Sequence, residues 1–435
     1  MPDFNFPVRL NRPVDGKLHG AFTDLMNGMA NPMNQIAFEY MRLQEQVQKL
    51  TAENQKLSVQ NQKLQADVTK LTSQVNTKGP VVPTVGPAPG LQLGVGVAPG
   101  AIVGAETGKK PAADGERFQL ERTISIHEAP VHSVAMSTQL NIVATASWDA
   151  TINLYNLSTD KIVRTLGGSS SAEEKMGGLY AVAFSKTVPD ILGCTSCDKN
   201  VYLWNHQTGK PLAKLGGGQQ GHQDEVNGID FHSSQQVMCT ASDDKKVIIW
   251  DFQEGIVLRT LETHTKAVYG STFLGQEMQY FVATCCFDMK TRIFDMRDKQ
   301  VVALLQEHTD DIIGIDYSSA KGLIATGSDD GNICIWNTRT WKLQHKINTR
   351  DDLKNPDNEV KRVSFSPDGM LLAAACSSGS VQVYDMSATP KHIAKLGDHK
   401  DCVFDVCWGI CPTTRAKMLV SASHDRTSMY WREVL

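Results

Sequence analysis

Residues 221–251 read GHQDEVNGIDFHSSQQVMCTASDDKKVIIWD, and this stretch decides the fold. Residues 307–337 repeat its pattern, with EHTDDIIGIDY followed by LIATGSDDGNICIWN. Seven copies align on an aromatic residue near the end of each: Tyr155, Trp204, Trp250, Phe294, Trp336, Tyr384 and Trp431. The first and the last are 276 residues apart, so the mean interval is 46 residues. This interval is typical of a four-stranded propeller blade.

Three of the copies contain a histidine, a hydroxyl residue, an aspartate and a tryptophan at fixed spacing. The sets are His222, Thr240, Asp244, Trp250; His308, Thr326, Asp330, Trp336; and His399, Ser421, Asp425, Trp431. A histidine with a serine and an aspartate also suggests nucleophilic catalysis. An active site would not recur three times at the blade period, so we interpret the sets as structural hydrogen-bond networks that join strands.

Seven copies in phase resemble the WD-repeat family over residues 118–435. The resemblance implies an all-β, seven-bladed propeller in which the aspartate accepts from histidine, the histidine bonds the hydroxyl, and the hydroxyl meets the tryptophan N–H. The chain ends four residues after Trp431, so the last copy lacks its fourth strand. In the family the first strand completes the last blade, which gives FQLERTI (118–124) that role.

Four copies depart from the full set. Tyr155 and Phe294 replace tryptophan in the first and fourth, so we expect their last hydrogen bond to be altered or lost. The second copy has no histidine and carries Cys194 in place of the hydroxyl, and the sixth has Ser378-Gly379 at its turn and no histidine. We expect the second and sixth blades to be the loosest.

Residues 36–76 have a heptad pattern. Leucine or isoleucine repeats at Ile36, Leu43, Leu50, Leu57, Leu64 and Leu71, and the intervening set is Tyr40, Val47, Asn54, Asn61, Val68 and Val75. Leucine at d with β-branched residues or asparagine at a favours a two-stranded parallel coiled coil. Buried Asn54 and Asn61 require an in-register partner, so we expect a homodimer through this segment. The alternative is one long solvated helix.

Residues 27–42, NGMANPMNQIAFEYMR, contain a single arginine and no basic cluster, so the helix has nothing to place against DNA phosphates, and a leucine-zipper transcription factor is excluded. Residues 77–117 contain the run GPVVPTVGPAPGLQLGVGVAPGAIVG, whose glycine and proline content predicts a flexible linker. Residues 1–35 are interpreted either as a disordered lead-in or as a docking segment.

The charge balance gives no basic field for nucleic acid. The net charge is −4, divided as +2 up to Arg117 and −6 beyond it. No apolar run reaches the roughly 20 residues of a membrane span, and no secretion signal is visible. All ten cysteines follow residue 190, which is typical of reduced thiols. Cys194 and Cys197 lack a second paired motif, so neither zinc nor another cofactor is expected. We expect a cytoplasmic location, with the nucleus or the cytoskeleton as alternatives.

The resemblance also predicts which side chains face the narrow upper opening of the propeller: the turn residue before the tetrad aspartate and the second residue of each inner strand. These positions are rich in aromatic residues. We predict that Trp148, Tyr180, Tyr269, Phe287 and Phe404 form an apolar ring, flanked by Asp243 and Asp329, that grips a peptide or partner loop. The alternative is that some of these side chains plug the channel.

These features favour a non-catalytic oligomeric scaffold that binds other proteins through the propeller and itself through the coiled coil. The same order of parts occurs in Groucho/Tup-type transcriptional co-repressors, the coiled-coil WD-repeat subunit of autophagic conjugation, striatins, and ciliary or microtubule-associated proteins. An enzyme is the rival class, but no converging carboxylates, metal cluster or isolated nucleophile support it.

Overall fold

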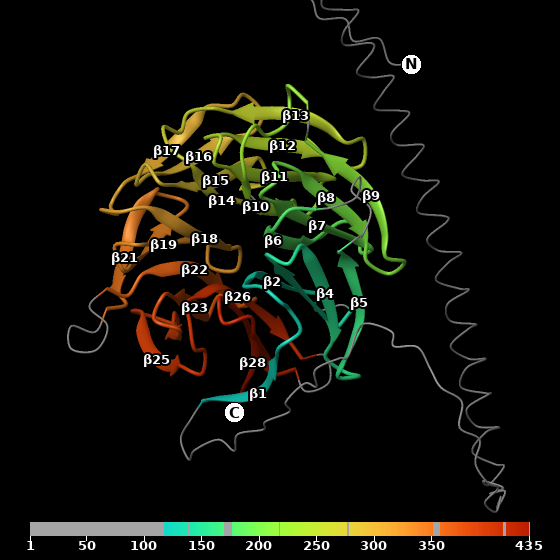
Figure 1. Ribbon diagram of the computed structural model, residues 1–435. Helices are drawn as coiled ribbons and strands as arrows, with labels where there is room; N and C mark the ends of the chain where they lie inside the picture. Colours follow the sequence, from blue (N-terminus) through green and yellow to red (C-terminus); the bar gives the residue numbers. More distant parts are fainter. Residues whose placement is uncertain are drawn as a thin grey trace, which may run out of the picture. The chain divides into compact units, whose positions relative to one another are not determined.

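The computed structural model describes residues 117–137, 140–168, 176–216, 218–275, 278–350, 357–411 and 415–434. These residues form seven four-stranded antiparallel sheets arranged as blades around a central axis (Figure 1). The predicted seven-bladed propeller is therefore confirmed. The predicted coiled coil of residues 36–76, the linker and residues 1–35 lie outside the described residues.

Each of blades 1 to 6 is a meander whose four strands follow one another in sequence. Blade 1 contains β2 (Val131–Ser137), β3 (Ile142–Ser147), β4 (Thr151–Asn156) and β5 (Lys161–Gly167). Blade 2 contains β6 (Leu179–Phe184), β7 (Ile191–Ser196), β8 (Val201–Asn205) and β9 (Lys210–Leu215). Blade 3 contains β10 (Val226–Phe231), β11 (Val237–Ser242), β12 (Val247–Asp251) and β13 (Ile256–Leu261).

The second half of the ring repeats this order. Blade 4 contains β14 (Val268–Phe273), β15 (Phe281–Cys286), β16 (Thr291–Asp295) and β17 (Val301–Leu305). Blade 5 contains β18 (Ile312–Ser318), β19 (Leu323–Ser328), β20 (Asn332–Asn337) and β21 (Lys342–Asn348). Blade 6 contains β22 (Val360–Phe365), β23 (Leu371–Cys376), β24 (Val381–Asp385) and β25 (Lys391–Leu396).

Blade 7 closes the ring by joining the two ends of the propeller sequence. It contains β26 (Val403–Ile410), β27 (Lys417–Ser423) and β28 (Ser428–Glu433), and its fourth strand is β1 (Phe118–Ile124). β1 pairs antiparallel with β28, from Phe118 opposite Glu433 to Ile124 opposite Ser428. The predicted closure is confirmed, and it leaves no open gap between the last blade and the first.

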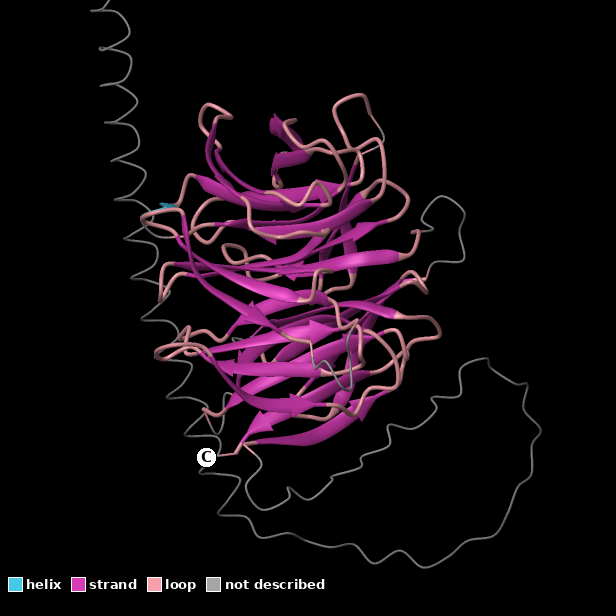
Figure 2. Cartoon of the chain, turned by 90° about the vertical axis from the view of Figure 1, so that its left-hand side faces the viewer, coloured by secondary structure: helices cyan, strands magenta, loops and turns pink. Residues whose placement is uncertain are grey.

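The core is divided into seven apolar clusters, one between each pair of adjacent blades. The middle strands are buried along their whole length in β11, β19 and β23, whereas outer strands such as β5, β9 and β21 are mostly exposed. In the side view of Figure 2, the strands of successive blades lie one above another. Because every blade packs on both neighbours, the inner strands hold the central channel in a fixed shape.

Candidate protein-interaction surface

A β-bulge at the start of every inner strand leaves one residue without a partner on the neighbouring strand. In each case the pairing register shifts across the second residue of the strand, as between Val131 and Ser133 in β2 or between Val226 and Gly228 in β10. The seven bulged residues are His132, Tyr180, Asn227, Tyr269, Ile313, Lys361 and Phe404. A bulged residue is left unpaired and its side chain is re-aimed, which brings these seven to one end of the channel.

A backbone hydrogen bond then brings a turn residue beside each bulge. The turn between the second and third strands donates its N–H to the carbonyl of the residue just before the inner strand. The seven bonds, all 2.9–3.0 Å long, join Trp148 to Pro130, Cys197 to Gly178, Asp243 to Glu225, Phe287 to Ala267, Asp329 to Asp311, Ser377 to Glu359, and His424 to Cys402. We call these fourteen residues and the seven bulged residues the upper face.

Four side chains of the upper face form one aromatic cluster across blades 7, 1 and 2. His132 lies between Phe404 and Trp148, with ring centroids 4.1 and 5.2 Å away and nearly parallel planes. Tyr180 meets the edges of His132 and Trp148 at 5.4 and 5.9 Å. Trp148 remains 50% exposed although its ring is apolar. We call Trp148, His132, Phe404 and Tyr180 the seam cluster, because it bridges the last blade and the first.

The other predicted aromatic residues form a separate pair in blade 4, where Tyr269 and Phe287 stack at 5.4 Å. The five aromatic residues therefore lie on the predicted face, but they form two groups rather than one continuous ring. Blade 3 separates the groups because its two corresponding positions hold Asn227 and Asp243. Their role in binding stays a prediction.

His132 was not among the predicted binding residues, yet it lies at the centre of the seam cluster. Burial, and then the nearby His424, lowers the pKa of His132 to about 4, so the ring is neutral near pH 7. A neutral imidazole stacks between Phe404 and Trp148 without bringing a charge to the surface. Its position as the bulged residue of β2 was the sequence signal for it.

The two predicted acidic residues differ in their surroundings. Asp329 lies 2.9 Å from the ammonium of Lys361, which also binds Glu359 at 2.6 Å. Asp243 accepts instead from the Asn227 amide at 2.6 Å. The hydroxyl of Tyr180 in blade 2 donates to Glu225 in blade 3. The surface therefore has carboxylates that share one lysine at blades 5 and 6 and carboxylates with neutral donors at blade 3.

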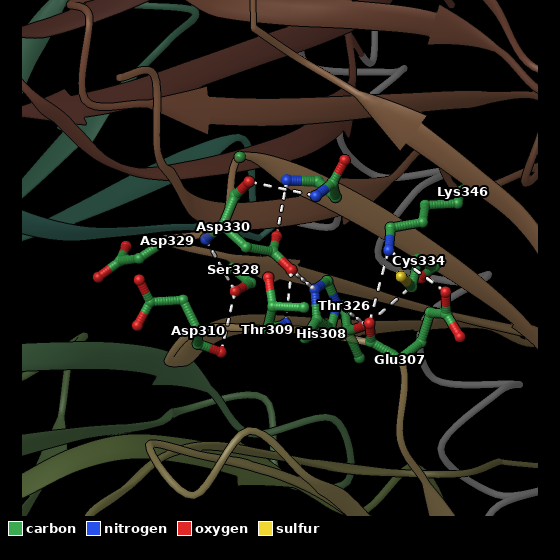
Figure 3. A network of polar contacts seen from close by, with 12 residues as sticks. Glu307, His308, Thr309, Asp310, Thr326, Ser328, Asp329, Asp330, Cys334 and Lys346 are labelled. Atoms are coloured by element: carbon green, nitrogen blue, oxygen red, sulfur yellow. Dashed lines mark hydrogen bonds and ion pairs between the residues drawn. The ribbon is translucent and has the colours of Figure 1, made fainter. Parts of the chain in front are cut away.

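The predicted tetrads are hydrogen-bond networks. In blade 5, His308 Nδ1 lies 2.9 Å from Asp330 and its Nε2 lies 2.9 Å from the Thr326 hydroxyl (Figure 3). The Trp336 indole donates to that hydroxyl at 3.0 Å. Blade 3 repeats this with His222, Asp244, Thr240 and Trp250 at 2.8–2.9 Å. In blade 7, His399 binds Asp425 and Ser421 at 3.0 and 2.6 Å, but no bond joins Trp431 to Ser421 among the described residues.

The expected alteration of blades 1 and 4 is confirmed. Thr145 donates to the Asn153 carbonyl at 3.4 Å, and Tyr155 accepts from Arg122 at 3.0 Å. In blade 4, Phe294 has no polar atom that could donate to Thr284, whose hydroxyl donates to the carbonyl of Arg292 at 3.2 Å, just as Thr326 in blade 5 donates to the carbonyl of Cys334 at 3.4 Å. Both blades keep the bond between histidine and hydroxyl, at 2.8 and 2.7 Å.

A catalytic role for these sets conflicts with their burial. Ser421, Thr240 and Thr326 are all completely buried within their strands, so no substrate carbonyl reaches their hydroxyls. Asp330 fixes its histidine: burial alone would raise the pKa of this carboxyl, but the hydrogen bonds from His308 and the backbone hold the pKa well below its usual range.

One group of possible metal ligands exists among the described residues: His264, Cys286 and Asp288. The Arg292 guanidinium donates to Asp288 at 2.7 Å and to His264 Nδ1 at 2.6 Å, so a cation already sits at these ligand atoms. Burial raises the pKa of the Cys286 thiol to about 12, which opposes the thiolate form that a metal needs. The group does not fit a metal centre. Burial likewise raises the pKa of Cys194 to about 12.

The channel also contains a cavity of about 740 Å³, lined by the later residues of all seven inner strands. Two ion pairs line it: Lys186 lies 2.8 Å from Asp230, and Arg362 lies 2.9 Å from Asp405. Asp405 also accepts from the Ser133 hydroxyl at 2.7 Å and from the Val134 N–H at 3.0 Å. These contacts tie blade 6 to blade 7 and blade 7 to blade 1, so they strengthen the ring.

The fold and these networks define a protein with WD40 repeats in a seven-bladed β-propeller. The model of the WD domain, G-beta repeat, matches residues 118–156 and 209–251. The model described as nucleolar protein 10-like, N-terminal domain, matches residues 294–429. Within the described ranges, no helix has the length and apolar character needed to cross a bilayer.

Curated relatives share this part of the chain at low identity. Protein tipD of Dictyostelium discoideum is 26% identical over 70% of this chain and 47% of its own length. Nuclear distribution protein PAC1 of Arthroderma benhamiae is 24% identical over 65% of this chain and 61% of its own length. WD repeat-containing protein 37 of Pongo abelii is 25% identical over 58% of this chain and 48% of its own length. The chain thus spans about half to three fifths of these relatives.

Proposed function

We propose that this protein is a non-catalytic scaffold that binds an exposed segment of a partner protein on the upper face of its propeller. The observation that carries the proposal is the seam cluster, in which Trp148 stays 50% exposed beside three further rings. Aromatic side chains grouped on a surface are the usual anchors of protein interfaces. The similarity to other WD40 propellers supports a protein-interaction scaffold as well.

The relatives do not favour one cellular process. Their names include a nuclear distribution protein and, in Arabidopsis thaliana, pre-mRNA-processing factor 19 homolog 2. A co-repressor of Groucho/Tup-like architecture and a cytoskeletal, ciliary or autophagy adaptor remain alternative forms of the same scaffold. A cytoplasmic location belongs to the proposal too, and fluorescence microscopy of the tagged full chain tests it.

Self-association through residues 36–76 is the second half of the proposal. It rests on the heptad pattern and on Asn54 and Asn61 at a positions. Sedimentation of the full chain should give a dimer, and replacing both asparagines with leucine should add trimers or tetramers. A monomer at tens of micromolar would contradict this half alone.

The test of the binding surface is truncation of single rings. Trp148→Ala and Phe404→Ala should each weaken partner binding by about 1–3 kcal/mol. Trp148→Ala should also leave the melting temperature nearly unchanged, because its side chain is half exposed. Tyr280→Ala is the matched control, since Tyr280 is an exposed aromatic residue between β14 and β15, at the other end of the blade.

Affinity capture with each variant, with partners identified by mass spectrometry, separates the outcomes. Partners lost with Trp148→Ala and kept with Tyr280→Ala support the proposal. Partners that all survive Trp148→Ala place the binding surface elsewhere. Turnover of a substrate in a broad hydrolase and transferase screen would favour the rival class, an enzyme.

A further inference from the structure

The upper face carries more negative charge than its own cations balance. Its carboxylates are Glu225, Asp243, Asp311, Asp329 and Glu359, and its lysine is Lys361. Lys361 is shared between Asp329 and Glu359, and Lys266, outside the face, approaches Asp311 to 3.7 Å. Glu225 and Asp243 form no ion pair among the described residues. The unbalanced charge is therefore concentrated in blade 3.

The fold holds these two acidic residues next to each other. The Asp243 N–H donates to the Glu225 carbonyl at 3.0 Å, the bond that recurs in every blade. Their side chains have only neutral donors, Asn227 for Asp243 and the Tyr180 hydroxyl for Glu225. Burial, and then the charges of Glu225 and Asp224, raise the pKa of Asp243 even though Asn227 lowers it. A nearby positive charge would remove this repulsion.

Aromatic rings lie on both sides of this acidic pair. Blade 2 contributes Tyr180, which belongs to the seam cluster, and blade 4 contributes the stacked pair Tyr269 and Phe287. A cation over an aromatic face is attracted by the negative potential of the ring, and the attraction strengthens as the cation is desolvated. Either group alone would accept other ligands, whereas rings and carboxylates together favour a positively charged side chain.

We propose that Glu225 and Asp243 bind an arginine side chain of the partner segment, between Tyr180 and the Tyr269–Phe287 pair. The inference rests on the proposed function and names the chemistry of its partner. Arginine fits better than lysine, because its planar guanidinium donates to two carboxylates at once and stacks on rings. A nucleic-acid partner is disfavoured, since its phosphates would meet five carboxylates.

The test uses the full chain and a phage library of random peptides, followed by fluorescence anisotropy with the selected peptides. Arginine should be enriched at one position. Replacing that arginine with citrulline, which keeps the shape and removes the charge, should weaken binding at least tenfold. Glu225→Gln and Asp243→Asn should each weaken binding by a similar factor and reduce its salt dependence. Both substitutions keep an oxygen that accepts a hydrogen bond.

Glu254→Gln is the matched control, because it removes one negative charge from the exposed turn between β12 and β13, at the opposite end of blade 3. It should leave binding unchanged. Peptides that depend on Trp148 but tolerate citrulline and Glu225→Gln would overturn the arginine assignment and leave the proposed function standing. A library that yields no peptide dependent on Trp148 would contradict the proposed function itself. The citrulline comparison decides the matter even if a variant folds poorly.

Discussion

Blades 3 and 2 bury the same kind of turn with different chemistry. In blade 3, His222 comes from the loop before the inner strand and joins Asp244 in the turn to Thr240 in β11, and Trp250 of β12 completes the set. In blade 2 the Tyr202 hydroxyl donates to Asp198 at 2.5 Å, only four residues away. The first network ties three segments together, whereas the second stays mostly within one hairpin.

Blade 6 shows that histidine can be replaced without losing this reach. Asn358 precedes the inner strand as His222 does, donates to the Thr349 hydroxyl at 3.2 Å and accepts from the Ser378 N–H at 3.3 Å. Gln382 donates to the Thr349 carbonyl at 2.9 Å and accepts from Tyr384 at 2.5 Å. In blade 2 the corresponding link is a single bond, from the Gly177 N–H to Asp198 at 3.3 Å, and among the described residues the buried Trp204 indole N–H has no hydrogen-bond partner. The number of chain segments that a network joins therefore matters more for the turn than the residue types that form the network.

The largest expected effect comes from opening the ring, which tests whether the blade networks hold the fold without closure. Deleting Phe118–Ile124 removes the pairing of β1 with β28, which consists of six residue pairs, and the buried side chains of Phe118 and Ile124. Loss of such side chains costs about 3–5 kcal/mol each, so we expect the deletion to destabilise the propeller by more than about 5 kcal/mol. Urea denaturation followed by circular dichroism measures this. A near-normal transition midpoint would show that the blades are autonomous.

Next comes the turn itself, compared between blades 5 and 6. Asp330→Ala should cost about 1–3 kcal/mol of unfolding free energy, because it leaves buried His308 without its acceptor. Ser378→Ala should be nearly neutral, because its hydroxyl contacts only Ser380 at 2.9 Å. Chemical denaturation of both variants gives the comparison. Equal losses would mean that the network in blade 5 is not what stabilises its turn.

Acid sharpens the same comparison. The folded-state pKa of Asp330 lies below its unfolded value, so its stabilisation is present above about pH 4 and disappears as the pH falls further. The difference in unfolding free energy between wild type and Asp330→Asn should therefore shrink toward pH 2.

Asp316, in the channel, has the opposite sign. Burial raises its pKa to about 6, so the stability it contributes is greatest below about pH 4 and is lost as the pH rises through 6. The wild type should lose stability relative to Asp316→Asn over that range. Denaturation curves at several pH values test both carboxyls, and parallel trends for the two would contradict this account.

The smallest effect is expected in blade 2. Tyr202→Phe removes the single link from β8 to Asp198 and should cost about 0.5–1.5 kcal/mol. Tyr430→Phe is the matched control, because the Tyr430 hydroxyl is buried without a partner, so its removal should be neutral or slightly stabilising. Thermal melts distinguish the two. A larger loss for Tyr430→Phe would refute the assignment of these hydroxyls.

Sequence periodicity predicted the parts of the fold that repeat. The seven aromatic positions and the histidine–hydroxyl–aspartate sets follow from spacing, because each blade solves the same packing problem, whereas the closing strand was implied by the resemblance to WD repeats. The residues that complete the networks of blades 2, 4 and 6 were not predictable in this way. Tyr202, Asn358 and Arg292 each occur at a position where the repeat has no fixed residue, so only three-dimensional contacts reveal their roles.

The candidate site was predicted to a similar degree. The resemblance to WD repeats implied that Trp148 and Phe404 face the upper opening, and the bulge and the turn bond that recur in each blade bring them there. It did not reveal that His132 stacks between them or that Lys361 binds Asp329, because those contacts depend on side-chain conformations and on neighbouring blades. Of the acidic pair in blade 3, Asp243 was predicted as a binding residue. Glu225 was not, because it lies one residue before the inner strand.

The binding surface proposed at the seam cluster spans the junction between the last blade and the first, where the ring closes. Phe404 belongs to the last blade and His132 to the first, and residues 118–124, which precede the first blade, pair with 428–433 of the last. A chain that lacks blade 7 has no Phe404 to complete the cluster. Conversely, a partner that binds only the closed ring adds its binding free energy to closure. Its presence should slow the separation of the strands of blade 7. A bound partner would therefore stabilise the closed propeller.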